Sequence, residues 1–185
     1  MSIDTIVGLV ALPRSGTTML SAVFDAHPDV VALYEPWNSD AEDTIAQDKS
    51  FTEERTIGRL FDEGLRIKTS ARVLIIKETA TQPEYITNLF ALLDGAGPDV
   101  NCQPVILLRN PLHCFLSEVE ARRRWWGVPS SAVTAEFFLQ WASSRLPVLG
   151  EMAMSIKLRG GKVIFYDTLV AHPQASFSRV MREFG

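Results

Sequence analysis

The chain has 185 residues, and 46% of them are hydrophobic, which is enough to form one sizeable core but short for two full domains. We therefore expect a single domain that spans residues 1–185. The 18 Lys and Arg residues are outnumbered by 22 Asp and Glu residues, and the formal charge of -4 excludes binding of nucleic acid or of an anionic membrane surface through overall charge. Any anion that the protein binds must be held by a local site.

The first predicted element is a buried strand that leads through a tight turn into a helix. Thr5–Leu12 is a nearly continuous apolar run, as expected for a central parallel strand covered on both faces, and it ends at Pro13. The following segment, Thr17–Ala26, carries apolar residues at helical spacing. His27-Pro28 ends this helix, because proline disfavours helical geometry in the residue before it.

Four more apolar runs of strand length follow, at Val30–Tyr34, Val73–Lys77, Pro104–Leu108 and Lys162–Tyr166. Helical patterns separate most of them, including one over Glu84–Leu93 and, after the last strand, one through Phe177, Val180, Met181 and Phe184. Strands that alternate with helices predict an α/β fold: a three-layer sandwich with a central parallel sheet, similar to the P-loop NTPases. The charge-dense segment Trp37–Arg72 is interpreted as a surface helix with irregular flanks, a kind of segment that often covers an active site.

The turn between the first strand and the first helix has the composition of an oxyanion site. Backbone amides at a helix N-terminus are free donors, and the positive end of the helix dipole points at the turn. Gly16 allows the backbone to approach a ligand closely, Thr17 and Thr18 add hydroxyl donors, and Arg14 adds a permanent positive charge. The alternative is an ordinary turn in which Ser15 or Thr17 caps the helix.

A Walker A loop does not fit this turn, because Ala11 stands at the position of its first glycine and Thr17 at the position of its lysine. ATP or GTP hydrolysis is therefore disfavoured. The string P-R-S-G-T-T at 13–18, followed by Met19-Leu20, instead resembles the 5'-phosphosulfate loop of the sulfotransferases that use 3'-phosphoadenosine 5'-phosphosulfate (PAPS). The resemblance implies that Arg14, Ser15, Gly16, Thr17 and Thr18 bind this donor.

A second motif at the end of the fourth strand supports the resemblance. Arg109-Asn110-Pro111 is followed by Ser117 eight residues after the arginine, the spacing of the family's R-[DN]-P motif and serine. The resemblance implies that Arg109 and Ser117 bind the 3'-phosphate of PAPS, whereas a surface arginine and an incidental helix serine are the alternative. Tyr166-Asp167-Thr168-Leu169 is also similar to the family's Y-E-D-L segment, with Asp167 where glutamate is commoner.

The activity that the resemblance implies is transfer of a sulfuryl group from PAPS to a hydroxyl or amine of a small-molecule or carbohydrate acceptor, with 3'-phosphoadenosine 5'-phosphate (PAP) as the product. Such transfer needs a general base for the acceptor proton. Glu35 in Tyr34-Glu35-Pro36 resembles the E-P glutamate of bacterial and carbohydrate sulfotransferases and is our candidate base, with Glu78 as the next candidate. Thr79 stands where the cytosolic branch has a histidine, and a surface carboxylate is the alternative interpretation of Glu35.

Two further catalytic expectations concern charge. Lys77, at a strand end, is expected to stabilise negative charge on the leaving phosphate and on the transferred group, with Arg14 as a second cation; a solvated lysine is the alternative.

We expect no metal, since His27, His113 and His172 are scattered. Arg122-Arg123-Arg124-Trp125-Trp126 is either an acceptor-binding segment or a solvated helix end.

Other interpretations remain open at this point. A non-catalytic nucleotide-binding domain would keep the donor site without turnover, and a P-loop small-molecule kinase would use Mg-ATP. The resemblance also implies a basic, glycine-containing loop that closes over the donor, and we expect this domain, whose sequence ends at Gly185, to lack it. The absence of a recognisable secretory signal, together with Cys102 and Cys114 as free thiols rather than a disulfide, predicts a cytoplasmic protein. The net charge predicts no nucleic-acid or membrane partner.

Overall fold

The computed structural model of the chain describes residues 3–36, 57–79, 83–125, 129 and 133–184. Five strands form one parallel sheet in the order β2-β3-β1-β4-β5. Their bounds are Thr5–Ala11 (β1), Val30–Tyr34 (β2), Val73–Thr79 (β3), Asn101–Leu108 (β4) and Lys162–Phe165 (β5). The predicted α/β fold with a central parallel sheet is confirmed.

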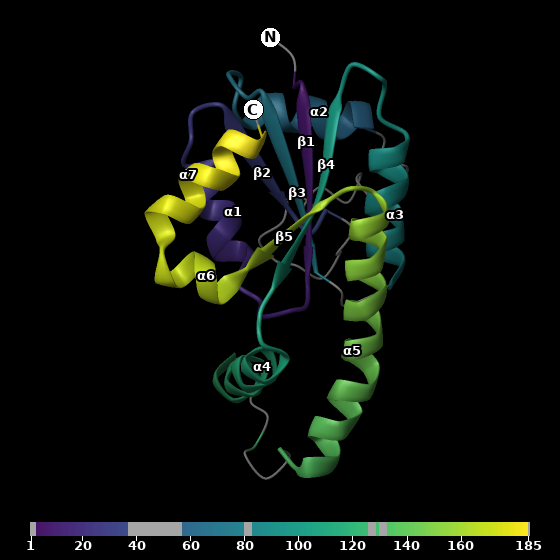
Figure 1. The fold of residues 1–185 in the computed structure, drawn as a ribbon, viewed down its shortest axis with the longest axis vertical. Coiled ribbons are helices and arrows are strands. Elements are labelled where there is room, and N and C mark those ends of the chain that lie inside the picture. Colours follow the sequence, from purple (N-terminus) through teal and green to yellow (C-terminus); the bar gives the residue numbers. More distant parts are fainter. Residues whose placement is uncertain (1–2, 37–56, 80–82, 126–128, 130–132, 185) are drawn as a thin grey trace.

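Helices cover both faces of this sheet (Figure 1). One face packs against α1 (Thr17–Asp25), α6 (Tyr166–Ala171) and α7 (Pro173–Phe184), and the other against α2 (Ile57–Ile67), α3 (Pro83–Asp94) and α5 (Ala135–Leu158). Successive residues of β1 alternate between the two cores, because side chains of a strand point to opposite faces: Val7 and Leu9 lie in the first core, Ile6 and Val10 in the second. Helix α4 (Pro111–Trp125) lies beyond the C-terminal end of β4, beside α5 (Figure 1).

The predicted strands differ from the observed ones only at their ends. β3 continues to Thr79, and β4 begins at Asn101, three residues before Pro104. Proline is tolerated there because β5 pairs with β4 only from Val105 onward, so Pro104 has a neighbouring strand on one side alone. The fifth strand was predicted to end at Tyr166, but it ends at Phe165, and Tyr166 begins α6.

The helix predictions agree with the structure where they can be compared. α1 and α3 match the predicted helices, α7 contains the predicted C-terminal periodicity, and α2 is the helix expected within Trp37–Arg72. Residues 37–56 of that segment lie outside the described residues. The 24-residue helix α5 was not delineated from the sequence; its N-cap is Thr134, whose side chain accepts a hydrogen bond from the Phe137 amide.

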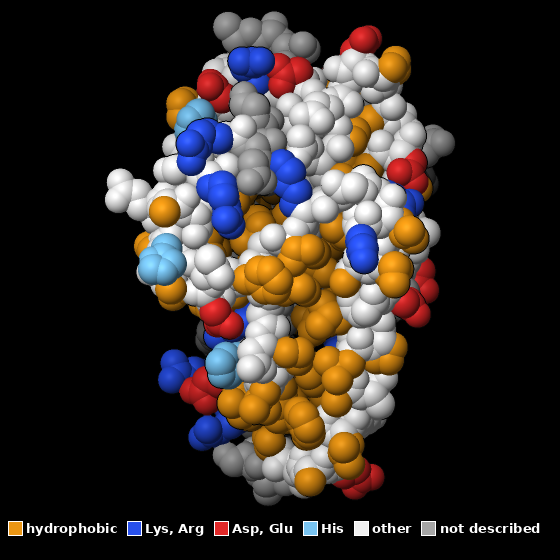
Figure 2. All heavy atoms as spheres, viewed as in Figure 1, with side chains coloured by type: hydrophobic (Ala, Val, Ile, Leu, Met, Phe, Trp, Pro, Cys, Tyr) orange, Lys and Arg blue, Asp and Glu red, His pale blue; other side chains and the backbone are white. Residues whose placement is uncertain are grey.

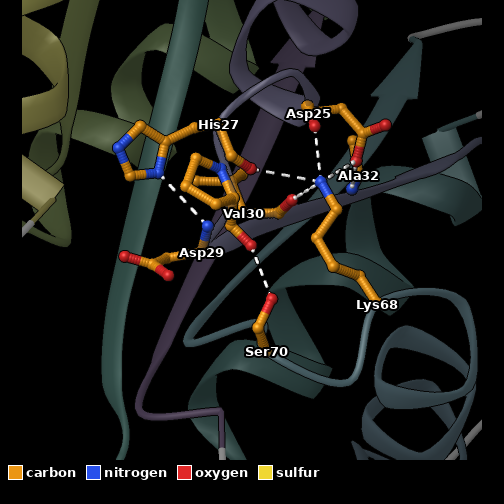
Figure 3. A network of polar contacts seen from close by, with 8 residues as sticks. Asp25, His27, Asp29, Val30, Ala32, Lys68 and Ser70 are labelled. Atoms are coloured by element: carbon orange, nitrogen blue, oxygen red, sulfur yellow. Dashed lines mark hydrogen bonds and ion pairs between the residues drawn. The ribbon is translucent and has the colours of Figure 1, made fainter.

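A single lysine fixes the turn between α1 and β2 (Figure 3). The Lys68 Nζ donates to the backbone carbonyls of Asp25, His27 and Val30, and it lies 3.5 Å from the Asp25 carboxylate. That carboxylate also accepts from the Ala32 amide at 3.0 Å. Because Asp25 is the last residue of α1, these contacts hold the C-terminal end of the helix whose N-terminus follows the predicted anion-binding turn, residues 13–18, called the anion loop below.

Exposed apolar side chains gather over the face formed by α4, α5 and β5 (Figure 2). The exposed large hydrophobic residues of these elements include Leu112, Leu116, Leu139, Leu146, Val163 and Phe165. None of the predicted site residues belongs to this set. In the part of the chain that the structure describes, no helix is both long and apolar enough to cross a membrane.

Candidate functional site

The anion loop leaves β1 at the carboxyl edge of the sheet and leads directly into α1. Two of its residues have left-handed backbone conformations, Arg14 with φ 66° and Gly16 with φ 93°. Gly16 is the N-cap of α1, and its carbonyl accepts the first helical hydrogen bond from the Leu20 amide at 3.0 Å. No side chain of the described residues caps α1, so the alternative in which Ser15 or Thr17 caps the helix is wrong.

Three contacts join this loop to the second predicted motif. The Arg109 guanidinium donates to the Arg14 carbonyl at 2.8 Å, and the Arg14 Nε donates to the Ser117 hydroxyl at 3.3 Å. The Ser15 hydroxyl lies 3.4 Å from the Cys114 thiol, one turn before Ser117 on α4. The two motifs, about 100 residues apart in the chain, therefore form one cluster at the carboxyl edge, where open α/β sheets bind their ligands.

Arg109 has a buried donor that the described residues leave unused. Its guanidinium stacks on the Tyr166 ring, 4.4 Å from the ring centroid, and its Nε is buried without a hydrogen-bond partner among the described residues. Buried donors are nearly always paired in proteins, so an unpaired one next to an anion loop is suited to a ligand. A guanidinium held by stacking and by a backbone carbonyl is also preorganised for an oxyanion.

Tyr166 is a site residue that the sequence analysis did not select. A Cβ atom added to Gly16 would lie 2.5 Å from the Tyr166 ring, so the ring packs directly on the loop as well as on Arg109. The Y-D-T-L segment was the available signal, but its tyrosine was assigned to a strand. As the first residue of α6, it instead reaches the anion loop.

The hydroxyl groups of the loop differ in their exposure. Ser15 and Thr17 are buried, whereas Thr18 is exposed. The Ser15 hydroxyl is engaged with Cys114, and burial is the largest cause that raises the pKa of the Cys114 thiol. Of the three predicted hydroxyl donors, Thr18 is therefore the one whose side chain already faces the surface.

A second polar cluster lies at the ends of β2 and β3. The Lys77 ammonium forms an ion pair with the Glu35 carboxylate, which also accepts from the Thr79 hydroxyl at 3.2 Å. The Lys77 side chain is only 5% exposed, so the alternative of a solvated strand-end lysine is wrong. Glu35 has φ 47°, and its amide donates to the Lys77 carbonyl at 2.7 Å.

This cluster lies on the same face of the sheet as α1. Ile75 of β3 belongs to the core beneath α1, and Lys77 and Thr79 follow it at alternate positions. β2 is two strands from β1, and neighbouring strands are about 4.8 Å apart, so the end of β2 at Glu35 lies roughly 10 Å from the end of β1, where the anion loop begins. Glu78 points to the opposite face and is 0% exposed, which makes it unsuited to contact an acceptor.

The arginine run at the end of α4 is paired with acidic residues of its own helix. Arg122 forms an ion pair with Glu118, and Arg123 and Arg124 form ion pairs with Glu120. This pairing favours the solvated helix end over the acceptor-binding interpretation. Trp126 lies outside the described residues.

Two surface cavities are lined by other parts of the described residues. One, of about 280 Å³, adjoins the amino ends of β2 and β3 at Val30 and Val73. The other, of about 470 Å³, runs along β5 between Lys162 and Arg179. Neither is lined by a predicted site residue. Among the described residues, no group of three or more His, Cys, Asp and Glu side chains could hold a metal ion.

Comparisons with known proteins agree with the predicted resemblance. Residues 7–91, which contain the anion loop, Glu35 and Lys77, match the sequence model of the Sulfotransferase family. The fold is similar to that in the crystal structure of mouse sulfotransferase SULT7A1 complexed with PAP, with 17% identity and a TM-score of 0.56.

The structural match covers 98% of this chain and 58% of the mouse protein, so the chain spans less than two thirds of that protein's length. Comparison with curated proteins gives no match. The match over residues 7–91 and the shared fold confirm the resemblance to the sulfotransferase family, with the sequence match covering the part of the chain that contains the anion loop, Glu35 and Lys77.

Proposed function

We propose that the protein transfers a sulfuryl group from PAPS to a hydroxyl or amine of a small-molecule or carbohydrate acceptor. The observation that carries this proposal is the hydrogen bond from Arg109 to the Arg14 carbonyl, because it joins the two anion motifs into one site. A nucleotide with phosphate groups at both its 3' and 5' positions needs two such motifs close together. The complex of mouse sulfotransferase SULT7A1 with PAP supports the same class of donor.

The two motifs would divide the donor between them. The amides at the N-terminus of α1, with Arg14, Ser15, Gly16, Thr17 and Thr18, are suited to the 5'-phosphosulfate. Arg109 and Ser117 are suited to the 3'-phosphate, and the unpaired Arg109 Nε supports this role.

The transfer step would use the polar cluster at the ends of β2 and β3. The acceptor oxygen or nitrogen forms a bond to sulfur while the bond from sulfur to the bridging oxygen of the 5'-phosphate breaks, and PAP leaves. Glu35 takes the acceptor proton, and Lys77 and Arg14 stabilise the negative charge that develops on the leaving phosphate. The contact between Lys77 and Glu35 supports a shared role for the two residues.

Calorimetry with PAP and with Mg-ADP tests the donor assignment. We expect binding of PAP and no comparable binding of Mg-ADP, which a kinase would prefer. Arg14→Ala and Arg109→Ala should each weaken PAP binding by roughly ten- to a hundredfold, the loss expected when a charged hydrogen bond is removed. Arg182→Ala removes an exposed arginine from α7 and should leave PAP binding unchanged. Equal effects of all three substitutions would contradict the proposed site.

Transfer of radiolabelled sulfate to a panel of alcohols, sugars and amines separates an enzyme from a non-catalytic nucleotide-binding domain. Glu35→Gln should keep PAP affinity within about twofold and slow transfer by at least about a hundredfold, the usual contribution of a general base. Unchanged turnover in this variant would assign the base to another residue. Binding of PAP without transfer to any acceptor would favour the non-catalytic alternative.

A further inference from the structure

Helix α4 contributes two side chains to the anion site but lies outside the sheet layers. Cys114 and Ser117 are three residues apart, so they share the face of α4 that contacts Ser15 and Arg14. Figure 1 shows α4 beyond the end of β4, beside α5. The direction of Ser117 therefore depends on what holds α4 against α5.

A buried carboxylate on α4 forms the polar part of that contact. Glu118 is 5% exposed, and both of its carboxylate oxygens are used. Its Oε2 accepts from the indole Nε1 of Trp141 on α5 at 2.8 Å, and its Oε1 accepts from Arg122 at 2.7 Å. Because Arg122 belongs to α4 itself, only the bond to Trp141 crosses to α5, and rotation of α4 that broke this bond would leave a buried carboxylate oxygen without its partner, which is unfavourable.

Aromatic rings form the apolar part of the same contact. Phe115 of α4 packs against Phe137, Phe138 and Trp141 of α5, with ring centroids 4.9 to 5.7 Å apart. The Arg122 guanidinium lies over the Phe137 ring at 5.2 Å. Apolar packing holds two helices together but tolerates small rotations and slides, whereas a hydrogen bond between two defined atoms fixes one register.

We infer that Glu118 is a positioning residue for the 3'-phosphate site: its hydrogen bond to Trp141 fixes the rotation of α4 and so keeps the Ser117 hydroxyl beside Arg14. This inference rests on the proposed function, in which Ser117 binds the 3'-phosphate. Glu118 itself touches neither the loop nor the donor in this scheme. It acts through Ser117, the residue before it in the sequence.

The test compares PAP with adenosine 5'-phosphate, which lacks only the 3'-phosphate. Calorimetry on the full chain should show that Glu118→Gln lowers PAP affinity about tenfold, a loss typical of one displaced hydrogen bond to a charged group, while affinity for adenosine 5'-phosphate stays within about twofold. Trp141→Phe removes the indole donor and should have the same selective effect. Glu120→Gln, on the same helix but in an exposed ion pair, is the matched control and should change neither affinity.

A double-mutant cycle separates positioning from a general structural role. If Glu118 acts through Ser117, Glu118→Gln should cause no further loss of PAP affinity in a Ser117→Ala background. An equal loss in both backgrounds, or a parallel loss of affinity for both nucleotides, would overturn the inference. If instead the unsubstituted protein shows no preference for PAP and Ser117→Ala has no effect, the proposed donor site itself is wrong.

Discussion

Three residues at the carboxyl edge of the sheet have positive φ values, and two of them are not glycine. Arg14 and Glu35 each follow a strand directly or within a few residues, and a left-handed conformation costs a residue with a side chain about 1 to 3 kcal/mol. In both cases a hydrogen bond offsets the cost: the Arg14 carbonyl accepts from Arg109, and the Glu35 amide donates to the Lys77 carbonyl. Strain is thus concentrated at the residues proposed to act on the donor and the acceptor.

Gly16 combines a positive φ with a close neighbour, and this combination leads to a prediction. Gly16→Ala should lower the free energy of unfolding by about 2 kcal/mol or more, because its Cβ would meet the Tyr166 ring at 2.5 Å in addition to the backbone strain. It should also weaken PAP binding, since displacement of the ring would move the stacked Arg109. Urea denaturation and calorimetry measure the two effects.

Two other glycines supply the controls for this prediction. Gly160 has φ 66° but nothing within 4 Å of an added Cβ, so Gly160→Ala should cost about 1 kcal/mol from strain alone and leave PAP binding intact. Gly150 lies within α5 with open space around it, and Gly150→Ala should stabilise the protein by about 0.5 to 1 kcal/mol. A cost for Gly16→Ala no greater than that for Gly160→Ala would contradict the contact with Tyr166.

At the scale of single elements, α1 is held at both of its ends. Its N-terminus is fixed by the contacts of the anion loop with Arg109 and α4, and its C-terminus by the Lys68 network. The Lys68 ammonium satisfies carbonyl groups that helix termini otherwise leave without a partner. The position of the anion loop therefore depends on a lysine at the other end of the helix.

Replacement of Lys68 should destabilise the protein. Lys68→Met keeps most of the side-chain length but removes every hydrogen bond of the ammonium, and we expect the free energy of unfolding to fall by about 2 kcal/mol. Lys157→Met, which removes an exposed lysine from the last turn of α5, should change it by less than about 0.5 kcal/mol. Equal midpoints of urea denaturation for the two variants would show that the Lys68 contacts contribute no net stability.

At the scale of the whole molecule, the sheet could be predicted from the sequence because parallel strands covered on both faces are continuous apolar runs. The loops at the ends of β1 and β4 could be identified because their motifs lie directly after such runs. The sequence did not predict two contacts of the site: the packing of Tyr166 on Gly16 and the hydrogen bond of Glu118 with Trp141. Both depend on the directions of helices that follow the strands, which residue spacing alone does not specify.

The two cysteines lie at opposite ends of β4, one near its start and one in the helix that follows it. Cys102 lies near the start of β4 and is half-buried, whereas Cys114 lies beneath the anion loop and is 0% exposed. Burial raises the pKa of both thiols, so little of either is present as the reactive thiolate at pH 8. Reaction of Cys114 additionally requires the loop and α4 to separate.

Labelling of single-thiol variants with a disulfide reagent tests this difference. At pH 8 Cys114 in a Cys102→Ser variant should react at least about tenfold more slowly than Cys102 in a Cys114→Ser variant, because it needs a local opening. The two rates should become similar in concentrated urea. PAP should slow the reaction of Cys114 further and leave that of Cys102 unchanged. Equal rates in the native state would show that the junction of the loop with α4 opens freely.

The bond between the Arg109 guanidinium and the Arg14 carbonyl spans 95 positions of the chain. The left-handed turn at Arg14 is thus maintained by a distant segment, since residues 13–18 alone would relax to a less strained backbone. Grafting residues 13–18 alone into another α/β scaffold would therefore transfer the sequence of the loop without its backbone conformation. A successful graft would also have to carry the end of β4 and the opening turns of α4.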